Sequence, residues 1–157
     1  MLQKLLIVPA FILLLAGCGD DFLYKKTLDI PNESWAYEDT LRFDFDIADT
    51  TKLYALFLDV THAGDYGFQN LYVQFHTAFP SGKTETKLVS LELAAATGIW
   101  NGKCSGNECT VEIPLQAKAH FPETGRHTLA IEQYMRQSPL AGIKRITLKI
   151  KELQQKK

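Results

Sequence analysis

The stretch Leu-Arg-Phe-Asp-Phe-Asp-Ile at residues 41–47 alternates apolar and charged side chains with a period of two. In a β-strand every second side chain lies on the same face, so the four apolar residues would share one face and the three charged residues the other. Such a strand has one face in the core and the other in water. The stretch therefore predicts a half-buried strand of a β protein.

Comparable segments follow along the chain. We expect strands over residues 53–61, 68–79, 86–93, 127–134 and 143–153, and a hairpin that pairs residues 99–100 with residues 110–113. The alternation is broken within residues 86–93, which indicates a β-bulge. Short strands separated by Gly, Pro and Asp turns favour an all-β fold, a two-sheet antiparallel β-sandwich of about eight strands.

One short helical connector is expected over residues 114–121. Leu115, Ala117 and Ala119 favour a helix, and Pro122 would end it. The β-sandwich domain is predicted to cover residues 35–157.

The amino terminus has the pattern of an export signal. A short basic start is followed by an apolar run over residues 5–15, which is too short to span a bilayer permanently. Leu15-Ala16-Gly17-Cys18 resembles the lipobox of bacterial lipoproteins, in which the cysteine is acylated. We therefore expect residues 1–17 to be a lipoprotein signal peptide, Cys18 to be the lipidation site and residues 18–34 to be a tether. An ordinary secretory signal with a chance cysteine is the alternative.

The two other cysteines, Cys104 and Cys109, enclose a turn-rich tetrapeptide. In an exported protein such a pair is expected to form a disulfide, here at a hairpin tip. A structural zinc site is the competing interpretation, but it needs two further ligands that this spacing does not supply. No metal or cofactor is expected, and 17 Lys and Arg against 18 Asp and Glu give no reason to expect a nucleic-acid partner.

Candidate catalytic residues do not form a recognisable constellation. The chain offers no nucleophile-elbow glycines, no helical metal motif and no companion spacing for its histidines, so we expect it not to be an enzyme. The histidines are expected to be strand or loop surface residues: His62, His76, His120 and His127. A calcium site at Asp44, Asp46 and Asp59 is the alternative to an ordinary solvated sheet face.

Aromatic residues expected near loops or hairpin ends are candidates for an interface with a partner: Tyr66, Phe68 and Trp100. Exposed aromatic side chains can anchor a protein interface or stack on a sugar, whereas buried ones belong to the core of a sandwich. A coplanar row of exposed aromatic residues beside Asn, Asp or Gln would indicate carbohydrate binding.

Features spread over nearly the whole chain resemble the GldH family of gliding-motility lipoproteins from Bacteroidetes-type bacteria. They are, in chain order, Cys18, Trp35, residues 41–45, residues 68–72, residues 98–102, Pro114-Leu115, residues 133–136 and residues 139–143. The pair Cys104 and Cys109 departs from the glycine-rich turn more usual in the family. The resemblance implies no catalytic residues and an accessory role beside the envelope machinery of gliding and type IX secretion.

The expected function is therefore that of an outer-membrane-anchored accessory lipoprotein that contacts envelope proteins without catalysis. A carbohydrate-binding β-sandwich module is the alternative. Gly19, rather than Asp, follows the cysteine, so the simplest inner-membrane retention signal of lipoproteins is absent. This favours the outer membrane. The acidic pair at residues 20–21 resembles a surface-export signal, so the periplasmic face and the cell surface both stay open.

Overall fold

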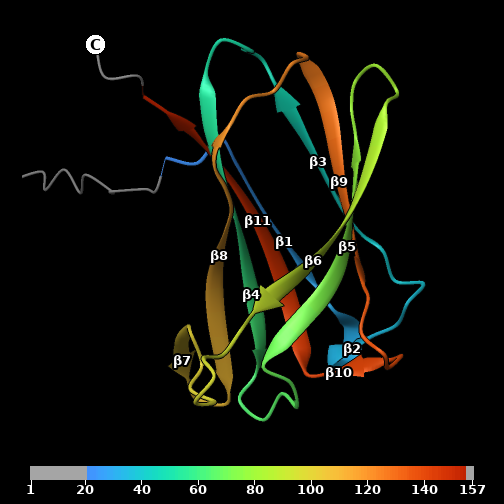
Figure 1. Ribbon diagram of the computed structural model, residues 1–157, viewed down its shortest axis with the longest axis vertical. Coiled ribbons are helices and arrows are strands. Elements are labelled where there is room, and N and C mark those ends of the chain that lie inside the picture. The colour runs from blue at the N-terminus through green and yellow to red at the C-terminus, as the bar shows by residue number, and fades with distance from the viewer. Residues whose placement is uncertain (1–20, 155–157) are drawn as a thin grey trace, which may run out of the picture.

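The structure is a computed structural model that describes residues 21–154, and it is built almost entirely of β-strands (Figure 1). Its elements, in chain order, are β1 (Tyr24–Asp29), the 3-10 turn η1 (Pro31–Glu33), β2 (Ser34–Trp35), β3 (Leu41–Ile47), β4 (Leu53–Ala63), β5 (Asn70–Ala78), β6 (Thr84–Glu92), β7 (Lys103–Ser105), β8 (Glu108–Ala119), β9 (Gly125–Gln133), β10 (Leu140–Ala141) and β11 (Ile143–Leu153).

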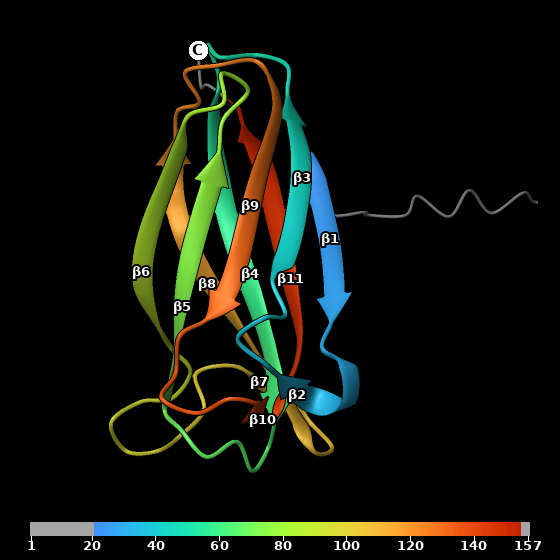
Figure 2. The same cartoon turned by 90° about the vertical axis from the view of Figure 1, so that its right-hand side faces the viewer.

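The strands form two antiparallel sheets that pack face to face, as Figure 2 shows. The first sheet has the order β1-β11-β4-β8-β7 and the second has the order β3-β9-β5-β6, while β2 and β10 pair at one end of the sandwich. This arrangement confirms the predicted all-β antiparallel sandwich.

The core lies between the two sheets and follows the alternation seen in the sequence. On β3, Phe43, Phe45 and Ile47 are buried, whereas the intervening charged residues are exposed. The same alternation places Leu71, Val73 and Phe75 of β5 in the core and Tyr72 outside it. Burial of these side chains removes apolar surface from water, which is the main force that holds the two sheets together.

The helical connector predicted over residues 114–121 is wrong, because β8 continues as a strand to Ala119. Pro114 lies opposite Phe57 of β4, and register shifts on both sides of Leu56 let the two strands stay paired around it. Pairing with β4 over most of its length outweighs the local helix propensity of Leu115 and Ala117. The bulge predicted in residues 86–93 is also wrong, since β6 pairs with β5 in unbroken register from Glu92 to Thr84.

Part of the segment over residues 18–34 that was expected to be a tether is instead a strand of the sandwich. Tyr24–Asp29 forms β1, which pairs along its whole length with β11. The Thr27 hydroxyl lies 2.8 Å from that of Thr147, and Tyr24 and Leu28 pack against the core. The predicted signal peptide and Cys18 lie outside the described residues.

Candidate functional site

An open groove lies at one end of the outer face of the β3-β9-β5-β6 sheet. Its volume is about 640 Å³, and it is lined by Phe68, Asn70, Tyr72, Tyr134, Met135, Arg136 and Gln137. Three of these residues are large aromatics that stay well exposed: Phe68 (39%), Tyr72 (42%) and Tyr134 (55%). Exposed aromatic side chains gathered around a hollow are typical of a binding surface.

Hydrogen bonds hold the segment after β9 against the start of β5. The Tyr134 amide donates to the Tyr72 carbonyl (2.7 Å), and the Tyr72 amide donates to the Met135 sulfur (3.2 Å). The buried Gln133 side chain accepts from the Met135 amide (2.9 Å) and donates to the Gln137 carbonyl (3.0 Å). These bonds fix the main chain, so the groove is preformed.

Tyr66 supports the groove from beneath. It is buried, its hydroxyl donates to the Asn70 carbonyl (3.1 Å), and its ring packs edge-on against Phe68 with 5.7 Å between the ring centres. Burial raises the pKa of the Tyr66 hydroxyl far above its ordinary value. Tyr66 therefore stays neutral and positions Phe68.

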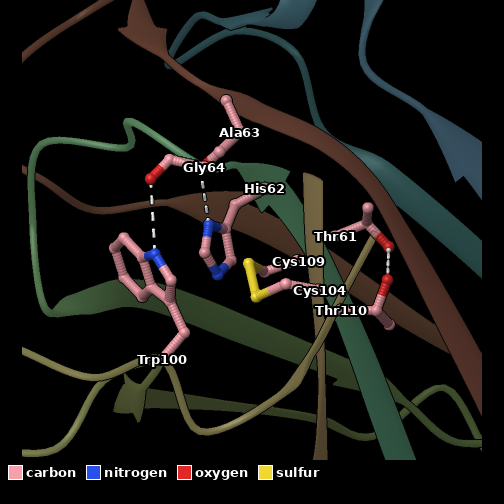
Figure 3. The surroundings of a disulfide bond; sticks show 8 residues. All are labelled: Thr61, His62, Ala63, Gly64, Trp100, Cys104, Cys109 and Thr110. Carbon is pink, nitrogen blue, oxygen red and sulfur yellow. Dashed lines mark hydrogen bonds between the residues drawn. A yellow bond between two sulfur atoms is a disulfide. The ribbon is translucent and has the colours of Figure 1, made fainter. Parts of the chain in front are cut away.

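Tyr66 also packs against His62, with 5.7 Å between the ring centres. Figure 3 shows the His62 imidazole between the Trp100 indole and the Cys104–Cys109 disulfide. The His62 and Trp100 ring centres are 4.3 Å apart, and the indole N–H donates to the Gly64 carbonyl (3.3 Å). Cys104 and Cys109 face each other across β7 and β8, so the disulfide closes the hairpin tip as predicted. The predicted pairing of residues 99–100 with residues 110–113 is wrong, because residues 103–105 pair with residues 108–110 and Trp100 forms a bridge with Ala94 instead.

The structure separates the three predicted interface residues. Phe68 lines the groove, but Tyr66 is buried beneath it and Trp100 is half-buried against His62. Sequence reasoning did not include Tyr72 and Tyr134 among the interface residues. Tyr72 could have been found, because it alternates with the apolar residues of its strand and must therefore face outward.

The prediction that all four histidines lie at the surface is wrong for His62 and His127, which are fully buried. His127 stacks on Phe45, and His62 packs against Trp100, so both imidazoles serve as aromatic core residues. The His62 Nδ1 atom lies 2.8 Å from the Ala63 carbonyl and must carry the proton, since a carbonyl only accepts. Its Nε2 atom is buried without a hydrogen-bond partner within the described part of the chain.

Protonation of His62 is expected to destabilise the fold. Burial lowers the pKa of His62 from 6.5, and the hydrogen bond to Ala63 offsets only part of that effect. Below about pH 6.5 the unfolded chain therefore binds a proton that the folded chain does not. The free energy of unfolding should fall between pH 7 and pH 5, and His62→Leu should flatten this dependence in urea titrations. His120→Gln, at an exposed site, is the control and should keep the slope; an unchanged slope in His62→Leu would contradict the assignment.

A second, polar groove of about 310 Å³ crosses the same outer sheet face. His76 contacts the Thr86 hydroxyl through Nδ1 (3.0 Å) and Glu132 through Nε2 (3.2 Å), and the Thr40 hydroxyl donates to Glu132 (2.8 Å). The Thr40 and His76 bonds lower the pKa of Glu132 against the effect of its partial burial. This chain of bonds links Thr40, which directly precedes β3, to β9, β5 and β6 across the sheet.

The calcium alternative does not fit the observed positions. Asp44 and Asp46 lie on β3, whereas Asp59 lies on β4 in the other sheet, where it pairs with Lys149 at 2.7 Å. Residues 21–154 hold no group of three His, Cys, Asp or Glu side chains that could bind a metal ion. Within the same residues no helix has the length and hydropathy needed to cross a membrane.

Comparison with known proteins places the chain among bacterial lipoproteins. A family model described as GldH lipoprotein matches residues 22–150. The chain is 26% identical over 127 residues to the gliding motility lipoprotein GldH homolog of Christiangramia forsetii, a match that covers 81% of this chain and 77% of that protein. It is 25% identical over 126 residues to gliding motility lipoprotein GldH of Flavobacterium johnsoniae, with 80% and 77% covered.

Among solved structures, a 4-O-methyl-alpha-glucuronidase with specificity for decorated arabinogalactans aligns with 97% of this chain and 20% of its own. The TM-score is 0.45 and the sequence identity is 12%. The family match covers most of the chain and agrees with both curated relatives. The chain belongs to the GldH lipoprotein family.

Proposed function

We propose that this protein is an outer-membrane-anchored accessory lipoprotein of the gliding-motility and type IX secretion-associated envelope machinery, and that it binds a partner protein without catalysis. The observation that carries the proposal is the preformed groove with exposed Phe68, Tyr72 and Tyr134 in a member of the GldH lipoprotein family. Aromatic side chains and Arg are the residues that most often dominate binding energy at protein interfaces, and Arg136 lines the same groove.

Lipid anchorage would strengthen such binding. A protein confined to a membrane surface meets a co-anchored partner at a high effective concentration, so modest contacts suffice for assembly. Acyl chains on Cys18 would provide that confinement, because two or three buried chains anchor a protein stably.

Cys18 is expected to be the mature, acylated amino terminus. Mass spectrometry of the protein purified from its native membranes should find a terminal peptide that begins at Cys18 and carries acyl groups. The Cys18→Ser variant should lose both the processing and the lipid mass. An unmodified amino terminus downstream of Cys18 would overturn the lipidation site.

The groove is expected to provide the partner contacts. Tyr72→Ala with Tyr134→Ala should reduce the recovery of cross-linked partners from native membranes by tenfold or more, a loss typical of interface anchors. Ile99→Ala is a matched control, because Ile99 is an exposed apolar side chain outside the groove. Thermal melts should show that both variants fold. Folded groove variants that keep every partner and normal secretion would contradict a docking role.

A carbohydrate-binding function is the second candidate, since Asn70 and Gln137 place amide groups beside the exposed aromatic residues. Aromatic faces with neighbouring amide donors and acceptors suit a sugar ring. The same groove variants distinguish the two functions: loss of binding to purified envelope polysaccharide, with protein partners retained, would support the carbohydrate alternative.

A further inference from the structure

The outer edge of β6 carries unpaired backbone groups. Hydrogen bonds beside the two ends of β6 show which of its residues bond to the β5 side. The Phe79 amide donates to the Lys83 carbonyl (2.8 Å), and the Leu93 amide donates to the Gln69 carbonyl (2.9 Å). Bonded and non-bonded pairs alternate along an antiparallel ladder, so the odd-numbered residues of β6 bond to β5 and the even-numbered ones face away. No described strand other than β5 pairs with β6. The free groups therefore belong to Thr84, Thr86, Leu88 and Ser90, whereas the Glu92 carbonyl accepts from the Asn101 side chain (3.5 Å).

A cleft of about 480 Å³ lies beside this edge, between β6 and β8 of the opposite sheet. Val89 of β6 and Ile113 and Leu115 of β8 pack against the core but are only partly buried. Beyond Thr110, β8 also has no outer neighbour among the described strands, because β7 pairs only with residues 108–110. The core is thus incompletely covered on this side of the sandwich.

The side chains of β6 define which strand could cover the cleft. Leu91, Val89 and Lys87 lie opposite Leu71, Val73 and Phe75, so they belong to the inner face. Lys87 is exposed and has no ion-pair partner within residues 21–154. Glu85 on the same face is already paired with Lys83 at 2.7 Å. An added strand would therefore be favoured by an acidic residue opposite Lys87 and apolar residues opposite Val89 and Leu91.

We propose that β6 is an acceptor edge for an extended segment of a partner protein, which adds as an antiparallel strand with an acidic side chain opposite Lys87 and apolar side chains opposite Val89 and Leu91. The free main-chain N–H and C=O groups at every second residue of β6 can form hydrogen bonds with the main chain of an added strand. The side chains at alternate positions of that strand would then determine its specificity. This surface is separate from the aromatic groove, so the inference holds whether or not the groove binds a protein.

A second copy of β6 fits this edge poorly. Two-fold pairing centred on Leu88 puts Lys87 opposite Val89 and leaves Leu91 opposite Glu85. Pairing centred on Thr86 puts Lys87 opposite Glu85, but Val89 then faces Lys83. Neither register supplies an acid opposite Lys87 together with apolar residues opposite Val89 and Leu91.

The test uses the full-length protein in detergent and a fluorescein-labelled nonapeptide with valine at positions two and four, glutamate at position six and threonine elsewhere. A second peptide carries lysine at position six. Fluorescence anisotropy should show binding of the glutamate peptide about three- to tenfold tighter than the lysine peptide. Lys87→Glu should reverse that preference. Equal affinities, or a preference that Lys87→Glu does not change, would overturn the proposal.

Hydrogen exchange gives a second measurement that locates the peptide. The amides of Thr86, Leu88 and Ser90 should exchange more slowly when the glutamate peptide is bound, as measured with residue-level fragmentation. Leu88→Pro should abolish this binding without unfolding, because it removes an amide that faces the free edge rather than β5. Protection at the aromatic groove instead, or protection of β6 without peptide that rises with protein concentration, would also overturn the proposal.

Discussion

The Trp35→Ala variant is expected to lose about 3–5 kcal/mol of unfolding free energy, the range seen when a large buried aromatic side chain is removed. Trp35 is fully buried in β2, and its indole N–H donates to the Asp39 carbonyl at 2.7 Å. Its carbonyl also accepts from the Gln133 side chain (3.3 Å), and β2 pairs with β10 through Leu140. Trp35 therefore connects the core to the segment that forms the groove.

Urea unfolding followed by circular dichroism measures this loss. Trp35→Phe is the matched control and should lose much less, because it keeps most of the buried aromatic area. A loss below about 1 kcal/mol in Trp35→Ala would mean that the surrounding residues fill the space, and that Trp35 does not organise this end of the sandwich.

The Lys149→Met variant is expected to lose about 2–3 kcal/mol of unfolding free energy, because it leaves a poorly solvated carboxylate without its positively charged partner. The Lys149 side chain is only 7% exposed, and its ammonium lies 2.7 Å from Asp59 and 2.5 Å from Glu112. Burial lowers the pKa of Lys149, but the bonds to Asp59 and Glu112 outweigh it and raise the pKa overall. Removing the lysine leaves the Asp59 carboxylate unpaired in a side chain that is only 18% exposed. Glu112 is largely exposed, so water can solvate its carboxylate after the lysine is removed.

A double-mutant cycle separates the ion pair from simple packing. The combined variant Lys149→Met with Asp59→Leu should be more stable than Lys149→Met alone, since it removes the uncompensated carboxylate. Additive losses from the two single variants would show that the pair contributes through packing only. Denaturant midpoints at pH 7 are sufficient for the comparison.

The strands that alternate clearly could be predicted from the sequence. In residues 41–47 the alternation of apolar and charged residues matches the observed burial, and β3 has the predicted bounds. β1 could not be predicted in this way, because its sequence YKKTLD alternates apolar and polar residues only weakly. Its stability comes from pairing with β11, more than a hundred residues away. Long-range pairing of this kind leaves no local signal in the chain.

The site was only partly predictable for a similar reason. His62 follows Leu58 and Val60 at intervals of two, so its burial was implied by strand period, even though histidine alone suggests a surface residue. Tyr134 reaches the groove because the chain after β9 is bonded to Gln133 and Tyr72, and these contacts depend on tertiary structure. Residue type could not distinguish buried Tyr66 from exposed Phe68 two positions later.

The pairing of β1 with β11 also determines how the domain would bear mechanical load. The chain enters at the end of β1 near Tyr24, whereas the aromatic groove lies at the opposite end of the sandwich, where β5 begins (Figure 2). Tension between the amino terminus and a partner in the groove would pull along the strands, in the direction of shear. The bonds along the six residue pairs from Tyr24–Ile150 to Asp29–Arg145 would then share the force together instead of opening one after another.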